Sequence, residues 1–279
     1  MSSLISLDAV STADLERRFG GLARLYGHAG AQRIRQTHAV VVGLGGVGSW
    51  AAEALARSGV AKLTLIDLDH ISESNINRQV HALDNTLGQS KVVAMRERIH
   101  LINPSCVVAC VEEFVDAANW PQIAGCDVMD TATPLAVLDA CDQVRAKTAM
   151  AAWALQNGVN FITVGAAGGK RHAHRVDIDD LSLTTHDPLL AQLRYRLRKE
   201  QGAARVGKMG IACVFSRESV VQPDALCEVE NANDVNDGSL NCHGYGSVVS
   251  VTSTFGVCAA GWLLDKIASG FQIKPKRTL

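Results

Sequence analysis

The sequence predicts an α/β protein with a doubly wound, mostly parallel, Rossmann-like sheet, followed by a C-terminal extension of strand, loop and helix. Three observations predict this fold. Short apolar runs alternate with helical segments along the chain, glycine clusters follow two of the apolar runs, and acidic residues follow others. Alternating strands and helices of this kind build a parallel sheet with helices on both faces.

The composition limits the class of protein. The chain has 279 residues, of which 47% are hydrophobic and 20% charged. This is close to an ordinary globular protein and excludes a disordered chain or a collagen-like repeat. The 27 Lys and Arg residues balance 28 Asp and Glu residues, for a net charge of −1. A strongly basic nucleic-acid binder is therefore excluded for the chain as a whole, whereas a local basic face is not.

The first half of the chain predicts a βαβ unit behind a helical arm. Apolar residues recur every three or four positions over 11–36, which indicates a helix. Residues 38–43 are almost entirely apolar, as in a strand buried on both faces, and 50–58 have helical character. Residues 62–66 form the next predicted strand. Strand, glycine turn, helix and strand make the βαβ unit.

The alternation continues toward the C-terminus. We expect helices at 90–102 and 147–157, and strands at 106–114, 135–141 and 160–164. Residues 126–131 compete with 135–141 for the fourth strand. The polar, turn-rich segment 217–243 is predicted to be a long loop.

The cysteines and one uncharged segment bear on localisation. None of the eight cysteines forms a C-x-x-C pair, which argues against a four-cysteine zinc site, and no secretory signal is visible. We therefore expect reduced thiols and a cytoplasmic protein. Residues 244–264 carry no formal charge and are long enough to span a bilayer, but their hydroxyl groups and glycines favour a buried core helix. Membrane association through 244–264 is the alternative.

A glycine-rich turn lies between the first predicted strand and the next helix. It contains Gly43, Gly45, Gly46 and Gly48. Glycines let backbone N–H groups approach a phosphate, and the start of a helix adds a partial positive charge. Asp67, at the end of the second strand, is placed to accept ribose hydroxyls. These features predict nucleotide binding without separating NAD from ATP.

Two cations beyond the second strand favour ATP. Arg78 lies in the segment Asn75-Ile-Asn-Arg-Gln79, and Lys91 opens the following helix. Departing pyrophosphate carries charge that arginine and lysine can stabilise, whereas hydride transfer from a nicotinamide needs no such pair. Each cation alone would more often belong to a solvated surface. Together behind the glycine turn they point to a triphosphate.

These residues carry a family resemblance. The glycine turn, the Asp67-x-Asp69 pair, the Asn-x-Asn-Arg-Gln segment and Lys91 resemble the adenylation domain of the ubiquitin-activating-enzyme-like superfamily. The match is closer to its tRNA threonylcarbamoyladenosine dehydratase family. The stretches that carry it span nearly the whole chain in order: 18–27, 47–57, 75–83, 139–147, 165–169, 207–216 and 252–256. The resemblance implies one adenylation domain over 1–279, with a helical arm at 1–36, a nucleotide-binding core at 37–170 and a substrate and crossover-loop portion with a C-terminal helix at 171–279.

The resemblance also implies roles for the site residues. The four turn glycines would cradle ATP, and Asp67, with Asp69 beside it, would bind the ribose side of the nucleotide. Asn75, Arg78 and Lys91 would bind the phosphates, with the two cations acting in catalysis. Asp142 matches the family carboxylate that holds Mg²⁺, which is why 135–141 is the preferred fourth strand. Some family members bind a monovalent cation, so Na⁺ or K⁺ is a further candidate cofactor.

Further implications concern partners. Superfamily sites often take an arginine from a second subunit, so Arg18 or Arg24 would act in trans within a homodimer. Cys213 matches a position at which related enzymes carry a thioester, although a lone cysteine in an apolar run is more often buried. A sulfur-transfer protein is a candidate partner for Cys213 or Cys242.

The implied activity is ATP-dependent dehydration of threonylcarbamoyladenosine in tRNA, through an acyl-adenylate on the threonyl carboxylate. The alternative is adenylation of the C-terminus of a ubiquitin-like sulfur-carrier protein. An NAD-dependent dehydrogenase and a nucleotide-sensing scaffold without turnover rank below these. A tRNA substrate needs a phosphate-binding face, for which the candidates are Arg194, Tyr195, Arg196, Arg198, Lys199, Arg205, Lys208 and the tail 274–277.

Overall fold

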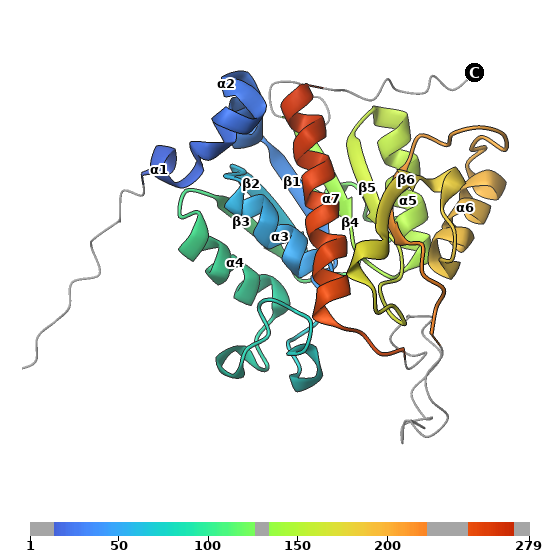
Figure 1. The fold of residues 1–279 in the computed structure, drawn as a ribbon, viewed down its shortest axis with the longest axis horizontal. Helices are drawn as coiled ribbons and strands as arrows, with labels where there is room; N and C mark the ends of the chain where they lie inside the picture. The colour runs from blue at the N-terminus through green and yellow to red at the C-terminus, as the bar shows by residue number, and fades with distance from the viewer. Residues whose placement is uncertain (1–13, 126–133, 222–244, 271–279) are drawn as a thin grey trace, which may run out of the picture.

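A single seven-stranded sheet forms the centre of the protein (Figure 1). The computed structural model describes residues 14–125, 134–221 and 245–270. The strands follow the order β3-β2-β1-β4-β5-β7-β6, and only β6 runs antiparallel to its neighbour. The predicted doubly wound, mostly parallel sheet is therefore confirmed. The strands are β1 (His38–Val42), β2 (Lys62–Ile66), β3 (Val107–Val111), β4 (Leu135–Asp139), β5 (Asn160–Val164), β6 (Val176–Asp180) and β7 (Ala212–Ser216).

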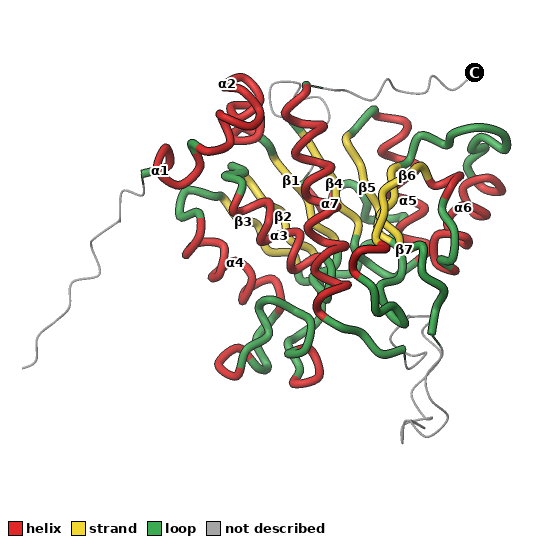
Figure 2. The backbone as a smooth tube through the Cα atoms, in the orientation of Figure 1, coloured by secondary structure: helices red, strands yellow, loops and turns green. Residues whose placement is uncertain are grey.

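Helices cover both faces of the sheet (Figure 2). Alternate residues of β1 show the division, because Ala39 and Val41 pack with one apolar core and Val40 and Val42 with the other. The first core also contains side chains of α2, α3, α4 and α7, and the second those of α5 and α6. The helices are α1 (Leu15–Phe19), α2 (Gly21–Gln36), α3 (Gly48–Arg57), α4 (Lys91–Ile102), α5 (Val144–Asn157), α6 (Pro188–Glu200) and α7 (Val249–Ser269).

The uncharged C-terminal segment is a core helix. α7 crosses the face of the sheet and packs against α3 and α2 (Figure 1). Gly256 makes this contact close, since a Cβ at this position would lie 2.3 Å from the carbonyl oxygen of Val47. Hydroxyl groups of α7 are satisfied within the helix, as when Ser253 Oγ donates to the carbonyl of Val249. In the part of the chain that the structure describes, no helix is long and apolar enough to cross a membrane.

The fourth strand lies where the dehydratase resemblance places it. β4 is formed by Leu135–Asp139, two residues shorter than predicted, and pairs with β1 and β5. The competing segment 126–131 lies outside the described residues. β3 is also shorter than the predicted 106–114, and the helical arm is divided into α1 and α2 at Gly20.

β7 is the strand of the predicted C-terminal extension of strand, loop and helix, whereas β6 was not predicted. β7 is formed by the apolar run that contains Cys213. β6 pairs antiparallel with β7 at the edge of the sheet. β6 reads Val-Asp-Ile-Asp-Asp, whose acidic residues obscure its alternating pattern. Both strands belong to the same sheet as β1, so the nucleotide-binding core and the portion beyond residue 171 share one sheet.

A buried ion pair connects β4, β5 and α5. Lys147 Nζ lies 3.1 Å from Asp139 Oδ2 and also donates to Thr163 Oγ1 at 3.0 Å. A third bond from the same ammonium reaches the carbonyl of Val164 at 2.9 Å. Both charged side chains are completely buried. Asp139 raises the pKa of Lys147 against the opposing effect of burial, so this lysine stays charged.

We predict that Lys147→Met destabilises the protein by about 3–5 kcal/mol, because it leaves the Asp139 carboxylate buried without its cation. The free energy of unfolding from urea titrations would measure this loss. Arg196→Ala is the control, since it removes a partner of a surface ion pair with Glu200 and should cost less than about 1 kcal/mol. Equal losses in the two variants would contradict the assignment.

A second prediction concerns acid. His81 is buried, and neither ring nitrogen has a hydrogen-bond partner among the described residues. Burial, with Lys91 and Arg98 nearby, lowers the pKa of His81 to about 4. The unfolded chain takes up this proton near pH 6.5, whereas the folded protein does so only near pH 4. Stability should therefore fall by about 3 kcal/mol as the pH drops through this window.

His81→Leu should remove its own share of this pH dependence of the free energy of unfolding and leave the share of His38, whose pKa burial and Lys62 also lower to about 4. His100→Leu, at an exposed position, should not change it. An unchanged slope in His81→Leu between pH 6.5 and 4 would show that another group carries the titration.

Candidate functional site

A cavity of about 360 Å³ opens at the carboxyl edge of the sheet. Residues at the ends of β1, β2, β4 and β5 line it. The chain winds outward in opposite directions from β1 and β4, so the cavity lies at the topological switch point, where open α/β sheets bind ligands. Its volume is within the range of small-molecule sites.

The glycine turn forms one wall of this cavity. Gly43 has a φ of 85°, and a Cβ at Gly48 would lie 1.8 Å from the carbonyl oxygen of Gly43. These two glycines are therefore required by the turn itself. Gly45 differs, because a Cβ there would meet nothing within 4 Å. Gly45 and Gly46 line the cavity directly.

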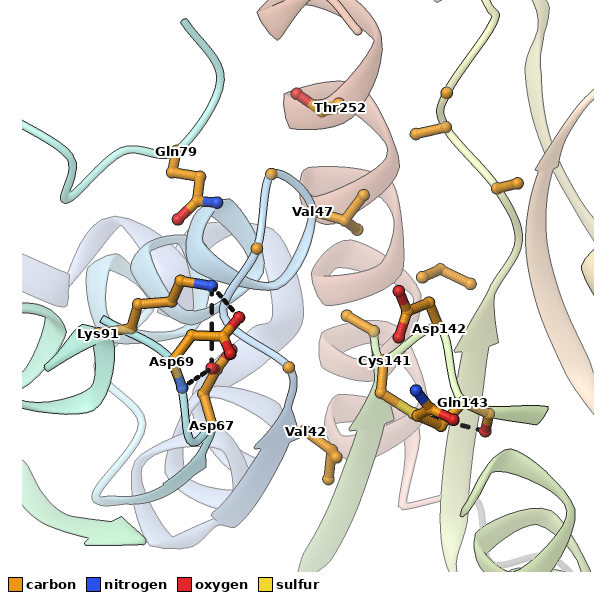
Figure 3. A pocket seen from close by; sticks show the side chains of 18 of the residues that line it. Val42, Val47, Asp67, Asp69, Gln79, Lys91, Cys141, Asp142, Gln143 and Thr252 are labelled. Atoms are coloured by element: carbon orange, nitrogen blue, oxygen red, sulfur yellow. Dashed lines mark hydrogen bonds and ion pairs between the residues drawn. The ribbon is translucent and has the colours of Figure 1, made fainter. Parts of the chain in front are cut away.

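Asp67, Asp69 and Lys91 form a connected group beside the turn (Figure 3). Asp67 Oδ2 accepts the backbone N–H of Leu44 at 2.5 Å, and its Oδ1 accepts that of Asp69 at 2.9 Å. Lys91 Nζ lies 2.6 Å from Asp69 Oδ2 and 3.9 Å from Asp67 Oδ1. Burial raises the pKa of Asp67, while Lys91 and the two amides partly offset this. The predicted ribose carboxylate and phosphate lysine are thus brought together.

The Asn-x-Asn-Arg-Gln segment covers the turn. Trp50 Nε1 of α3 donates to the carbonyl of Arg78 at 2.9 Å, which holds the segment over the glycines. Asn75 Oδ1 accepts the backbone N–H of Ser72, so its side chain also shapes the loop. The guanidinium of Arg78 donates to the carbonyl of Ser74 at 2.6 Å. Asn75 and Arg78 both line the cavity.

Gln79 is a site residue that the sequence reasoning missed. Its side chain lines the cavity and is buried, yet its Oε1 has no hydrogen-bond partner among the described residues. A buried amide oxygen of this kind needs a donor, which a bound ligand can supply. The sequence signal that could have identified Gln79 is its position directly after Arg78 in the Asn-x-Asn-Arg-Gln segment.

The opposite wall follows β4. Ala140, Cys141, Asp142 and Gln143 line the cavity there, across from Asp67 and Lys91 (Figure 3). Asp142 is thus placed at the cavity, as predicted. No cluster of three metal-ligating side chains occurs in 14–125, 134–221 or 245–270. A Mg²⁺ ion bound by one carboxylate and by nucleotide phosphates needs no such cluster.

The cavity continues to the residues that follow β5, and we refer to this part of it as the second lobe. Val164, Gly165, Ala166, Ala167 and Gly168 line it, together with Pro188, Leu189, Val220 and Tyr245. Asp187 fixes this turn, since its carboxylate accepts the N–H groups of Ala166 at 2.8 Å and Leu190 at 2.9 Å. A Cβ at Gly165 would collide with the Asp187 carboxylate. The sequence analysis did not identify Asp187, because its partner lies about 20 residues away along the chain.

Cys213 does not lie at the cavity. It sits on β7 with its side chain in the core, where burial raises the pKa of its thiol well above the usual value. Its role as a nucleophile stays a prediction that this geometry does not support. Among the described cysteines, only Cys141 lines the cavity, and burial followed by Asp139 raises the pKa of that thiol too. Cys242 lies outside the described residues.

Arg18 and Arg24 are distant from the cavity of their own chain. Arg18 Nη1 donates to the carbonyl of Ile102, at the end of α4. Lys91, which lines the cavity, is the first residue of the same helix. Ile102 therefore lies about 16 Å along the helix from Lys91. Arg24 is exposed on α2. Neither arginine lines the cavity of its own chain, and the in-trans role stays a prediction.

Much of the basic run on α6 is engaged locally. Arg194 Nη1 donates to the carbonyls of Leu181 and Thr184, and Arg196 pairs with Glu200. Arg198 Nε donates to the carbonyl of Ala204. Tyr195 is exposed, with Lys199 over its ring. The tail 274–277 lies outside the described residues. Most arginines of the predicted phosphate-binding face on α6 therefore already bind neighbouring groups of their own chain.

Comparison with known proteins agrees with this geometry. The model of the ThiF family matches residues 17–279. The tRNA threonylcarbamoyladenosine dehydratase of Escherichia coli is 41% identical over 257 residues, covering 90% of this chain and 93% of the relative. The crystal structure of that enzyme in complex with ATP has a TM-score of 0.79 at 40% identity, covering 92% of this chain and 97% of the other. A complex of the enzyme with AMP has a TM-score of 0.78.

Sulfur-carrier-activating relatives match only in part. The molybdopterin-synthase adenylyltransferase of Escherichia coli is 39% identical over 90 residues, covering 32% of this chain and 36% of the relative. The dehydratase match, by contrast, covers 90% of this chain and so extends far beyond the glycine turn. The chain therefore belongs to the ThiF family and, within it, to the tRNA threonylcarbamoyladenosine dehydratases.

Proposed function

We propose that this protein catalyses the ATP-dependent dehydration of threonylcarbamoyladenosine in tRNA. The observation that carries the proposal is the single cavity, which is lined by the glycine turn, Asp67 and Lys91 on one side and continues to the residues that follow β5. One lobe suits ATP and the other a second substrate, in a chain similar to a dehydratase over 90% of its length.

In this proposal ATP lies across the carboxyl ends of β1, β2 and β4. Asp67 accepts ribose hydroxyls, and the phosphates lie over Gly45 and Gly46 at the start of α3, where backbone N–H groups and the helix dipole favour negative charge. Arg78, in the Asn-x-Asn-Arg-Gln segment, and Lys91, at the start of α4, approach the phosphates. Ile66, Val115 and Ala146 supply apolar surface for the adenine.

Asp142 would hold Mg²⁺ together with the phosphates, since carboxylate oxygens are ligands that this ion prefers. The ion would supply charge neutralisation on ATP. A monovalent cation, Na⁺ or K⁺, is proposed by resemblance alone, with no residue assigned to it.

The threonylcarbamoyl group would occupy the second lobe. Its carboxylate oxygen attacks the α-phosphorus of ATP, which forms the acyl-adenylate and releases pyrophosphate. The carbamoyl oxygen then attacks the activated carbonyl carbon within the same molecule, the carbamoyl N–H loses a proton, and AMP leaves. The ring that closes lacks the elements of water. Arg78, Lys91 and the glycine turn stabilise charge that develops on the phosphates, while the lobe holds the reacting groups together.

We further propose a cytoplasmic homodimer in which Arg18 or Arg24 reaches the partner's cavity. Their distance from the cavity of their own chain supports this arrangement. A sulfur-transfer partner is a weaker proposal, because the described cysteines are buried or half-buried.

The glycine turn allows a matched prediction. Gly45→Ala should leave the free energy of unfolding within about 1 kcal/mol of wild type, because its Cβ meets open space. The same Cβ would stand where the phosphates lie, so ATP affinity should fall at least about tenfold in calorimetric titrations. Gly48→Ala should instead destabilise the fold, since its Cβ collides with Gly43. Undiminished ATP affinity in Gly45→Ala would contradict the phosphate placement.

Turnover tests the function directly. Wild-type protein with ATP and threonylcarbamoyl-modified tRNA should release AMP and pyrophosphate and yield the dehydrated nucleoside, as measured by mass spectrometry of tRNA digests. Lys91→Met and Asp142→Ala should each lower AMP release by about 10²–10³, the range seen when one charge-stabilising group is lost. Each variant should still unfold cooperatively.

Glu97→Ala, on the exposed surface of α4, is the control and should keep wild-type turnover. If wild-type protein makes no AMP with the modified tRNA, the proposed function is wrong. AMP formation that depends on a ubiquitin-like protein instead of tRNA would favour the sulfur-carrier alternative.

A further inference from the structure

We propose that a basic surface beside the second lobe binds phosphates of the tRNA strand that carries the modified adenosine. It consists of Arg171, His172, His174, Arg175 and Arg217, and we refer to it as the mouth surface. The inference rests on the proposed function, and it assigns the RNA-binding face to a place other than α6.

Strand topology puts the mouth surface at the edge of the cavity. β6 is antiparallel to β7, so β6 begins where β7 ends, and Val176 pairs with Ser216. β7 is parallel to β5, which makes this the carboxyl edge of the sheet. The N–H of Arg217 donates to the carbonyl of Arg175 at 3.0 Å, which joins the two segments.

The chain connects the mouth surface to the cavity on both sides. Gly168, three residues before Arg171, lines the second lobe, and so does Val220, three residues after Arg217. The N–H of Val221 donates to the carbonyl of Gly169 at 2.9 Å, so the segment before Arg171 and the segment after Arg217 are hydrogen-bonded to each other at the lobe. An RNA strand whose adenosine enters the lobe must therefore pass close to these cations.

The buried side chains of Glu218 and Lys170 hold the backbone of the segment that carries the mouth surface. Glu218 accepts the N–H groups of Arg171 at 3.0 Å and His172 at 2.9 Å, and it pairs with His172 Nδ1 at 2.8 Å. Burial alone would raise the pKa of Glu218, but these hydrogen bonds hold it at about 2. Lys170 Nζ donates to the carbonyls of His186 and Glu218. Glu218 thus positions the backbone of Arg171 and His172 and also holds the His172 ring.

The arginines of the mouth surface are available to a phosphate. Arg171, His172, His174, Arg175 and Arg217 are all exposed. Among the described residues, the guanidinium groups of Arg171 and Arg175 take part in no hydrogen bond or ion pair. Arg217 pairs with Asp177, but both side chains are largely exposed, so a phosphate could replace this partner at small cost. Arginine suits such contacts because its planar fork matches phosphate oxygens.

The basic residues that follow α6 lie at the other edge of the sheet. Arg205 and Lys208 precede β7, whose first residue pairs with Asp180, the last residue of β6. The N–H groups of Met209 and Gly210 donate to this same Asp180. About 13 Å of strand separates this amino edge from the carboxyl edge with the cavity. Arg205 and Lys208 are exposed and therefore make a charge-matched control pair.

The test compares R171A/R175A with R205A/K208A. Binding of threonylcarbamoyl-modified tRNA would be measured at several salt concentrations. R171A/R175A should weaken binding at least tenfold, and the slope of log affinity against log salt should shrink by about 1.4–1.8, as for two lost phosphate contacts. R205A/K208A should stay within twofold of wild type in affinity. R171K/R175K should recover most of the affinity, because the charges remain.

ATP affinity, measured separately, should be unchanged in every variant. Wild-type affinity for tRNA in R171A/R175A, or an equal loss in R205A/K208A, would overturn the assignment. Wild-type protein that binds the modified tRNA through the mouth surface but releases no AMP would overturn the proposed function alone. Turnover of the wild type together with undiminished tRNA affinity in R171A/R175A would overturn the mouth surface alone.

Discussion

The close backbone contact inside the glycine turn is the constraint on which the site depends. Gly48 lies against the carbonyl oxygen of Gly43, with no room for a side chain. This contact points the start of α3 at the cavity and presents the N–H of Leu44 to the Asp67 carboxylate. The same turn receives α7, where Gly256 approaches the carbonyl of Val47. The carboxylate proposed to bind ribose, the backbone proposed to bind phosphates and the C-terminal helix are therefore positioned by a single turn.

The opposite wall is organised by the buried ammonium of Lys147. It joins Asp139 at the end of β4 to the carbonyl of Val164 at the end of β5. Asp139 in turn accepts the N–H of Cys141, which directs the chain toward Asp142. The second lobe begins immediately after Val164. The glycine turn and the lysine thus each position one wall, and the two walls pack together where Gly43 lies against the backbone of Ala140.

The sequence predicted those parts of the site that depend on local patterns. The glycine turn, Asp67 and Lys91 were found because strand, turn and helix follow one another along the chain. Residues fixed by distant contacts were missed, as with Asp187 and the unpaired amide of Gln79. Cys213 was placed in an apolar run correctly, but the face toward which a strand residue points depends on strand pairing, and it points into the core. β6 was missed because its partner β7 lies beyond α6.

The arrangement of charges in the cavity suggests how it accommodates a polyanion. Two carboxylates, Asp67 and Asp69, share the ammonium of Lys91. Asp67 is held by two backbone N–H groups and is nearly buried, whereas the Asp69 side chain is 60% exposed. A phosphate that draws Lys91 away would therefore break the exposed pair with Asp69, which costs little in water. Asp67 would keep its amide donors and remain an acceptor for ribose. The net charge of −1 is thus compatible with binding both ATP and tRNA, because the acidic residues at the nucleotide are paired and the basic residues of the mouth surface lie outside it.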